Sequence, residues 1–119
     1  MYEVPSDQDW SFLLKNDLIQ VCYGQYQTQL RFEHDVIISI EGDIEHRDED
    51  EVLTKSEARE QNATSFLLLL GHRIESVAVE DKHTLALVFS NSHTLRLYAG
   101  EPDYESFSIS VPGAPPIIV

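Results

Sequence analysis

The apolar residues of the chain recur in the same order in its two halves, and this recurrence constrains the fold more than any other feature. The tetrapeptide SFLL at residues 11–14 is repeated at residues 65–68. Downstream, the Leu-x-Phe pair at residues 30–32 is matched by another at residues 87–89. Two copies are too few for a solenoid, which needs three or more repeats to bury a continuous core. The recurrence therefore predicts one pseudo-twofold domain rather than a repeat array.

The predicted domain spans residues 1–119, because a chain of 119 residues has the length of one ordinary domain. Its two repeat units are expected at about residues 10–45 and 64–111. Each unit contains an SFLL turn or helix end followed by three strands and the turns that join them.

Within each unit, apolar and polar residues alternate with the period of two that is typical of half-buried strands. Leu30 and Phe32 share one face of such a strand, whereas Gln29 and Arg31 share the other. Clusters of Asn, Asp and Ser between the alternating segments favour hairpin turns. Strands are expected at residues 18–21, 28–32, 36–40, 74–77, 84–89, 94–98 and 105–111.

One connecting helix is predicted between the units. Thr54 and Glu57 have the spacing of a capping box, residues 55–70 contain neither Gly nor Pro, and Gly71 follows where a left-handed cap is wanted. The run at residues 66–70 is apolar on all sides and is expected to be buried. The predicted fold class is thus α+β: a mostly antiparallel β-sandwich or partly open barrel, made from two pseudo-repeated β units and one helix.

The tail at residues 112–119 contains three prolines, which fix the backbone and remove hydrogen-bond donors. The tail is therefore expected to be extended. Two interpretations stay open: a free terminus, or a segment whose Ile117, Ile118 and Val119 dock on a neighbouring surface such as the second copy in a homodimer.

The charge of the chain excludes two classes of partner. The 21 acidic residues against 8 Lys and Arg give a formal net charge of −13. Nucleic-acid binders rely on basic side chains that neutralise phosphates, and anionic membranes attract basic segments, so neither partner is expected. A single cysteine, Cys22, the lack of a signal-peptide pattern and the lack of a long apolar run predict a cytoplasmic protein.

The acidic residues are concentrated in one part of the chain. Residues 41–60 hold nine carboxylates against Arg47, Lys55 and Arg59. Such a cluster is either a solvated loop or a face that steers a basic partner toward the protein, with a nearby aromatic residue as anchor. The candidate partner-binding residues are Asp43, Glu45, Asp48, Glu49, Asp50 and Glu51.

No motif in the chain indicates catalysis. The sequence lacks a G-x-S-x-G elbow, an H-E-x-x-H frame and a Gly-rich phosphate loop, so we expect no catalytic residue, no cofactor and no enzyme activity. His34, His83 and His93 fall in expected turns, and with Asp35 or Asp81 they leave a small-ligand or metal-binding module as the alternative. We assign no metal ligand.

The second half resembles a family of small uncharacterised bacterial proteins. The resemblance rests on the LLG turn at residues 69–71, the strand at residues 84–89 and the YESFSI segment at residues 104–109, where Phe107 replaces the usual Trp. Members of that family are often encoded near polymorphic-toxin genes, so the resemblance implies an immunity-like role. Together with the charge, it favours a protein-interaction module whose acidic face binds a basic protein such as a toxin.

Overall fold

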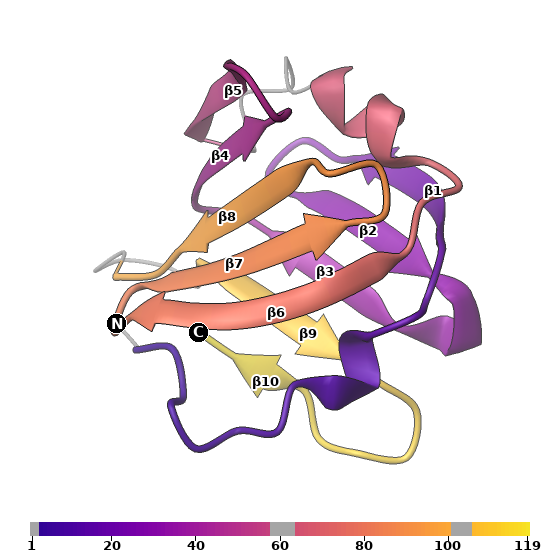
Figure 1. The fold of residues 1–119 in the computed structure, drawn as a ribbon. Helices are drawn as coiled ribbons and strands as arrows, with labels where there is room; N and C mark the ends of the chain where they lie inside the picture. Colours follow the sequence, from indigo (N-terminus) through magenta and orange to yellow (C-terminus); the bar gives the residue numbers. More distant parts are fainter. Residues whose placement is uncertain (1–2, 58–63, 101–105) are drawn as a thin grey trace.

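Two antiparallel five-stranded sheets pack face to face in the computed structural model, which describes residues 3–57, 64–100 and 106–119 (Figure 1). The first sheet has the order β1-β2-β3-β9-β10, and the second has the order β5-β4-β8-β7-β6. The sheets stay separate, so the described part of the chain forms a sandwich and not a closed barrel. The first sheet contains β1 (Leu18–Tyr23), β2 (Thr28–Phe32), β3 (Ile37–Ile40), β9 (Phe107–Ser110) and β10 (Ile117–Ile118). The second contains β4 (Asp43–Arg47), β5 (Val52–Glu57), β6 (Ile74–Asp81), β7 (Thr84–Phe89) and β8 (Thr94–Tyr98).

The core lies between the sheets and is built from the alternating residues that the sequence predicts. Leu30 and Phe32 of β2 and Phe89 of β7 are almost fully buried. The rings of Phe32 and Phe89 stack across the sandwich with centroids 6.3 Å apart, which joins the two sheets directly. The strands predicted at residues 28–32, 84–89 and 94–98 are thereby confirmed.

Each sheet combines a three-stranded meander with two strands from the other half of the chain. Strands β1, β2 and β3 form one meander, and β6, β7 and β8 form the other. After β3 the chain crosses to pair β4 with β8, and after β8 it crosses back to pair β9 with β3. The two crossings touch, because the backbone N–H groups of Glu41 and Gly42 donate to the carbonyl of Ser106, at 2.9 and 2.8 Å.

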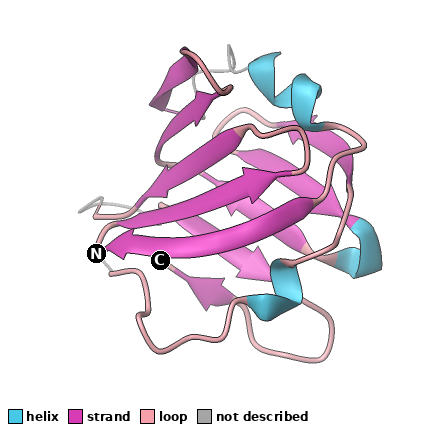
Figure 2. Ribbon diagram, viewed as in Figure 1, coloured by secondary structure: helices cyan, strands magenta, loops and turns pink. Residues whose placement is uncertain are grey.

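The prediction of a connecting helix is wrong for the first predicted turn, which is part of a strand. Lys55 and Glu57 belong to strand β5, and residues 58–63 lie outside the described part of the chain. Thr54 does not cap a helix; its hydroxyl contacts Ser65 Oγ. The helical structure that follows is a short 3₁₀ helix, η4 (Thr64–Leu69), and two further 3₁₀ turns, η1 (Ser11–Leu13) and η2 (Glu33–Asp35), occur earlier in the chain (Figure 2).

The C-terminal tail docks on its own chain. Strand β10 pairs with β9, and Val119 is buried. The backbone N–H of Val119 donates to Phe107 O at 2.9 Å, and Ser106 N–H donates to Val119 O at 2.8 Å. The extended tail therefore completes the first sheet, which decides against a free terminus.

Candidate functional site

The acidic cluster lies on the hairpin formed by β4 and β5, at one end of the sandwich (Figure 1). The expected loop from Asp43 is instead a strand as far as Arg47, and only residues 48–51 form the turn. Asp48 shapes this turn, because its Oδ1 accepts the backbone N–H groups of Asp50 and Glu51 at 2.7 and 2.8 Å. These two hydrogen bonds lower the pKa of Asp48, so the carboxylate that caps the turn stays ionised.

Glu45 is paired with basic side chains of the two neighbouring strands. Its carboxylate lies 3.2 Å from Arg96 Nη1 of β8 and 4.0 Å from Lys55 Nζ of β5. Arg96 also contacts Glu80 of β6 through Nε at 2.7 Å, and this hydrogen bond raises the arginine pKa. Glu45 is thus part of a charge ladder across the outer face of the second sheet and presents little free charge to a partner.

Four of the six candidate carboxylates are exposed and form no ion pair in the described part of the chain. Glu49, Asp50 and Glu51 are consecutive and exposed at the tip of the hairpin, and Asp43 is exposed at the opposite end of β4. Within residues 3–57, 64–100 and 106–119, no basic side chain forms an ion pair with any of these four. The six predicted residues therefore separate into an acidic tip (Glu49, Asp50 and Glu51), the structural Asp48, the paired Glu45 and the distant Asp43.

Helix η4 lies beside this hairpin and exposes apolar residues that were expected to be buried. Phe66 and Leu69 point into the core, whereas Leu67, Leu68 and Leu70 are exposed. A 3₁₀ helix has three residues per turn, so only positions three apart share its inner face. The prediction that the whole run is buried is therefore wrong.

In the described part of the chain, neither the β4–β5 hairpin nor η4 carries an exposed aromatic side chain that could act as the expected anchor. Among the described residues, the exposed large aromatic side chains are Tyr23 and Tyr26, on the hairpin between β1 and β2. The large apolar side chains exposed on η4 are aliphatic. Sequence reasoning missed them because it assigned every apolar residue in the run to the core.

A chain of hydrogen bonds connects η4 to β4 beneath this surface. His46 is fully buried, with Nδ1 2.9 Å from Ser65 Oγ and Nε2 2.9 Å from His93 Nδ1. Ser65 Oγ also contacts the Thr54 hydroxyl, and the ring centroid of His46 lies 5.9 Å from that of Phe66. Burial and the neighbouring His93 lower the pKa of His46 to about 4, although Asp48 opposes the effect. The neutral imidazole therefore works as a structural link between strand and helix.

Residues 10–119 match the family of unknown function DUF6188. The chain belongs to this family. No curated protein and no solved structure matches it, so the function of the DUF6188 chain has to be argued from its own residues. The sequence-based expectation of an uncharacterised family is confirmed at this level.

The histidines of the DUF6188 chain do not gather at one end of the domain. His83 precedes β7 and His93 precedes β8, so the two lie at opposite ends of that hairpin. His34 Nδ1 contacts Asn16 Oδ1 at 2.8 Å, and His93 contacts His46. In the described part of the chain, no group of three or more His, Cys, Asp or Glu side chains is placed to hold a metal ion.

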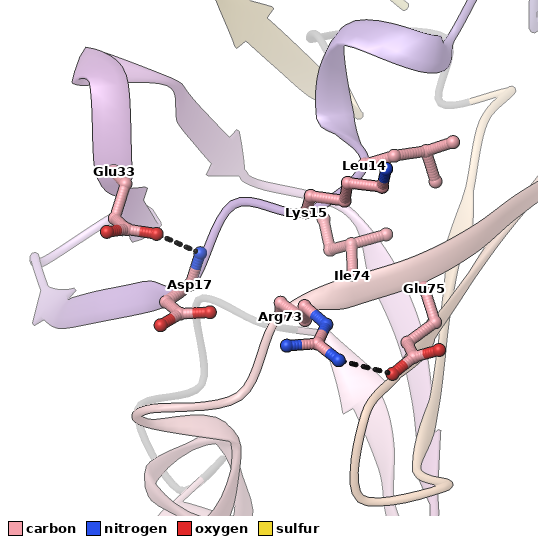
Figure 3. A pocket seen from close by; sticks show the side chains of 7 residues that line it. All are labelled: Leu14, Lys15, Asp17, Glu33, Arg73, Ile74 and Glu75. Atoms are coloured by element: carbon pink, nitrogen blue, oxygen red, sulfur yellow. Dashed lines mark hydrogen bonds and ion pairs between the residues drawn. The ribbon is translucent and has the colours of Figure 1, made fainter.

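A hollow of about 460 Å³ opens where the first strands of the two halves meet (Figure 3). Asp17 and Arg73 form an isolated antiparallel bridge there. Glu33 Oε1 accepts the backbone N–H of Asp17 at 2.9 Å, and Arg73 Nη2 lies 3.5 Å from Glu75 Oε1. The lining is mixed in charge: Leu14, Lys15, Asp17, Glu33, Arg73, Ile74 and Glu75.

A second hollow, of about 510 Å³, lies between the N-terminal segment and the proline-rich tail. Its lining is mostly apolar and includes Phe12, Val111 and Ile117. No helix among the described residues of the DUF6188 chain has the length and apolar content needed to cross a lipid bilayer.

Proposed function

We propose that the DUF6188 chain is a cytoplasmic protein-interaction module whose β4–β5 hairpin binds a basic protein. The observation that carries the proposal is the acidic tip: Glu49, Asp50 and Glu51 are consecutive and exposed, and none of them forms an ion pair with a basic side chain of the described residues. Asp48 fixes the turn that presents them. The proposal is of binding and not of catalysis.

The acidic tip suits a partner that is recognised by charge. Like charges on adjacent residues repel one another, and a basic partner relieves that repulsion when it binds. Complementary fields also raise the rate of encounter, an effect that weakens as salt screens the charges over about 10 Å at 0.1 M. The net charge of −13 extends the attraction beyond the hairpin.

A toxin that acts on nucleic acid is the kind of basic partner we favour. Such an active site holds phosphates with Lys and Arg, and a cluster of carboxylates can occupy the same groups. The resemblance of residues 69–71, 84–89 and 104–109 to proteins encoded near polymorphic-toxin genes supports an immunity role. The identity of the neighbouring genes is the quickest check of this narrower proposal.

A capture experiment tests the proposed function. The immobilised chain is incubated with extract of its source cells at 50 mM and 500 mM salt, and bound proteins are identified by mass spectrometry. We expect a basic protein that is retained at low salt and lost at high salt. Glu49→Lys with Glu51→Lys should abolish its capture.

The matched control is Glu3→Lys with Asp7→Lys, which changes the net charge equally at exposed residues of the N-terminal segment. The control should capture the same protein as the unaltered chain. Capture that survives the hairpin variant, or that both variants lose equally, would show that the hairpin is not the binding site.

A small-ligand module is the second candidate, and the hollow at Asp17 and Arg73 favours it. The hollow brings two basic and three acidic side chains around an apolar floor of Leu14 and Ile74. Native mass spectrometry of the purified chain distinguishes the two functions. A stoichiometric small molecule or metal would support the second candidate, and its removal by Arg73→Ala would place it in the hollow.

We also infer that the two halves are copies of one unit. Asp17 and Arg73 hold corresponding positions before β1 and β6, and their backbone N–H groups are accepted by Glu33 Oε1 and Ser90 Oγ, at 2.9 and 3.3 Å. Lys15 and Gly71, which precede them, both have a left-handed φ, of 67° and 81°. Lys15→Gly should therefore keep the fold without lowering Tm; a clear loss would contradict the correspondence.

A further inference from the structure

We propose that the exposed leucines of η4, together with Leu70 just after it and Ile19 of β1, form the apolar anchor site for the same basic partner. The patch consists of Leu67, Leu68, Leu70 and Ile19 and is called the leucine patch below. This inference rests on the proposed function and adds to it the place where the partner buries apolar side chains.

The leucine patch holds much of the exposed apolar surface of the described chain. The four side chains keep 49, 56, 40 and 62% of their surface in contact with water, in the order given. Only four other large apolar side chains in residues 3–57, 64–100 and 106–119 are comparably exposed. Grouped aliphatic exposure of this kind marks interaction sites, whereas single exposed residues are ordinary.

The chain after η4 turns back onto the edge strand β1. The backbone N–H of Gly71 donates to Leu18 O at 2.8 Å, so the backbones of Leu70 and Ile19 are neighbours there. Figure 1 shows the segment after η4 running beside β1. Ile19 points outward, whereas Leu18 is fully buried.

The leucines are held in place before any partner arrives. Phe66 and Leu69 are fully buried and fix the helix to the core. Asn91 Nδ2 donates to Leu68 O at 3.2 Å, and Ser65 Oγ lies 2.9 Å from His46 Nδ1. A patch that is already ordered loses little conformational entropy on binding, which favours its use as an anchor.

The surroundings of the leucine patch select a basic partner. Ser65 contacts Thr54 of β5, so η4 and the acidic hairpin form one end of the molecule. Thr64–Leu69 contains no charged residue, and the nearest strand pair ends in Glu49, Asp50 and Glu51. An apolar centre with a charged rim is the usual anatomy of a protein interface.

The same charges disfavour the other occupants. A second copy would bring another net charge of −13 and a second acidic tip to the contact. An anionic membrane would be repelled for the same reason. The occupant we infer is a protein segment that carries Lys or Arg beside aliphatic or aromatic side chains.

Two synthetic peptides of equal positive charge provide the probes. One places Leu at the i, i+3, i+4 and i+7 positions of an amphipathic helix with Lys on the other face, and the other has Ser in place of every Leu. Binding is measured by isothermal titration calorimetry at 50 mM salt. We expect the unaltered chain to bind the Leu peptide at least about tenfold more tightly than the Ser peptide, a ratio that corresponds to 1.4 kcal/mol.

Three variants separate the two proposals. Leu67→Ser with Leu68→Ser should remove the preference for the Leu peptide and leave the Ser peptide unchanged. Glu49→Lys with Glu51→Lys should weaken both peptides. Ile118→Ser, at an exposed residue of β10, is the matched control and should change neither.

Other results of these experiments would overturn the anchor site, the proposed function or the choice of occupant. Equal binding of the two peptides, or a preference that survives the leucine variant or disappears in Ile118→Ser, would overturn the anchor site while the charge effect could still hold. Loss of the charge effect in the hairpin variant would overturn the proposed function itself. A dimer in sedimentation velocity that the leucine variant converts to monomer would show that a second copy covers the patch and would overturn the inference.

Discussion

The fully buried imidazole of His46 lies with its Nε2 2.9 Å from Nδ1 of His93. One of these nitrogens donates a hydrogen bond and the other accepts it. The contact is therefore possible when both imidazoles are neutral or one is protonated, but not when both are protonated. The same His46 ring contacts Ser65 through Nδ1. The end of the molecule that carries the proposed binding surface therefore depends on a neutral histidine.

Acid should destabilise the fold through His46. Its pKa is about 4 in the folded chain, below the ordinary 6.5, so the unfolded chain binds the proton more readily. The free energy of unfolding should thus fall as the pH is lowered from about 6.5 to about 4, by at most about 3 kcal/mol. Urea unfolding at pH 7.5, 5.5 and 4.5 measures this loss. A His46→Gln variant should lose less over the same range, and an identical slope would assign the effect elsewhere.

Ser65→Ala should loosen η4. The variant removes the hydroxyl that contacts both His46 Nδ1 and Thr54, and it leaves a buried nitrogen without that partner. The expected loss in the free energy of unfolding is about 1–3 kcal/mol. Ser110→Ala, at an exposed residue of β9, is the matched control and should stay close to the unaltered chain. Equal stability of the two variants would mean that the hydrogen-bond chain contributes nothing.

Gly42→Ala tests the contact between the two crossings. A Cβ at Gly42 would lie 3.1 Å from both Cα and Cβ of Ser106, closer than about nine in ten real Cβ contacts, so Ser106 would have to shift. The resulting overpacking should cost about 1–3 kcal/mol. In Gly113→Ala no atom lies within 4 Å of the new Cβ. The free energy of unfolding should therefore fall only because of the positive φ of 80°, by about 1 kcal/mol. A Gly42→Ala protein as stable as the unaltered chain would refute the close approach.

Glu45 should contribute to stability rather than to binding. Its carboxylate is paired with Arg96 and Lys55, so Glu45→Gln should cost no more than about 1 kcal/mol and change partner affinity by less than about twofold. Glu49→Gln with Glu51→Gln should show the reverse, with weaker binding at unchanged Tm. Calorimetry of binding together with thermal unfolding separates the two effects. Weaker binding in Glu45→Gln would return this residue to the binding surface.

Strands β2 and β7 could be predicted from the sequence because each has one face in the core. The alternation in residues 28–32 and 84–89 reflects that geometry directly, and both strands form as expected. The pairing of β4 with β8 could not be predicted, because it joins segments that are distant along the chain. The crossing of strands between the two sheets is likewise a long-range property.

Local signals in the acidic segment and in the apolar run point away from the structure that forms. Charged residues are disfavoured in strands, so the composition of Asp43–Arg47 favours a loop although Ile44 and His46 alternate toward the core. Thr54 and Glu57 match a capping box, but β5 extends through both, because pairing with β4 outweighs the local signal. The period of three in η4 could have indicated that Phe66 and Leu69 alone are buried.

Mapping a bound partner on the chain by NMR is the most direct test of the central claim, that the acidic tip and the leucine patch form one binding surface. The captured basic protein is titrated into isotope-labelled chain, and amide shifts are followed residue by residue. The account predicts the largest changes at residues 49–51, 65–70 and 18–20. Shift changes confined to the hollow at Asp17 and Arg73, or to the second hollow beside the proline-rich tail, would contradict the account.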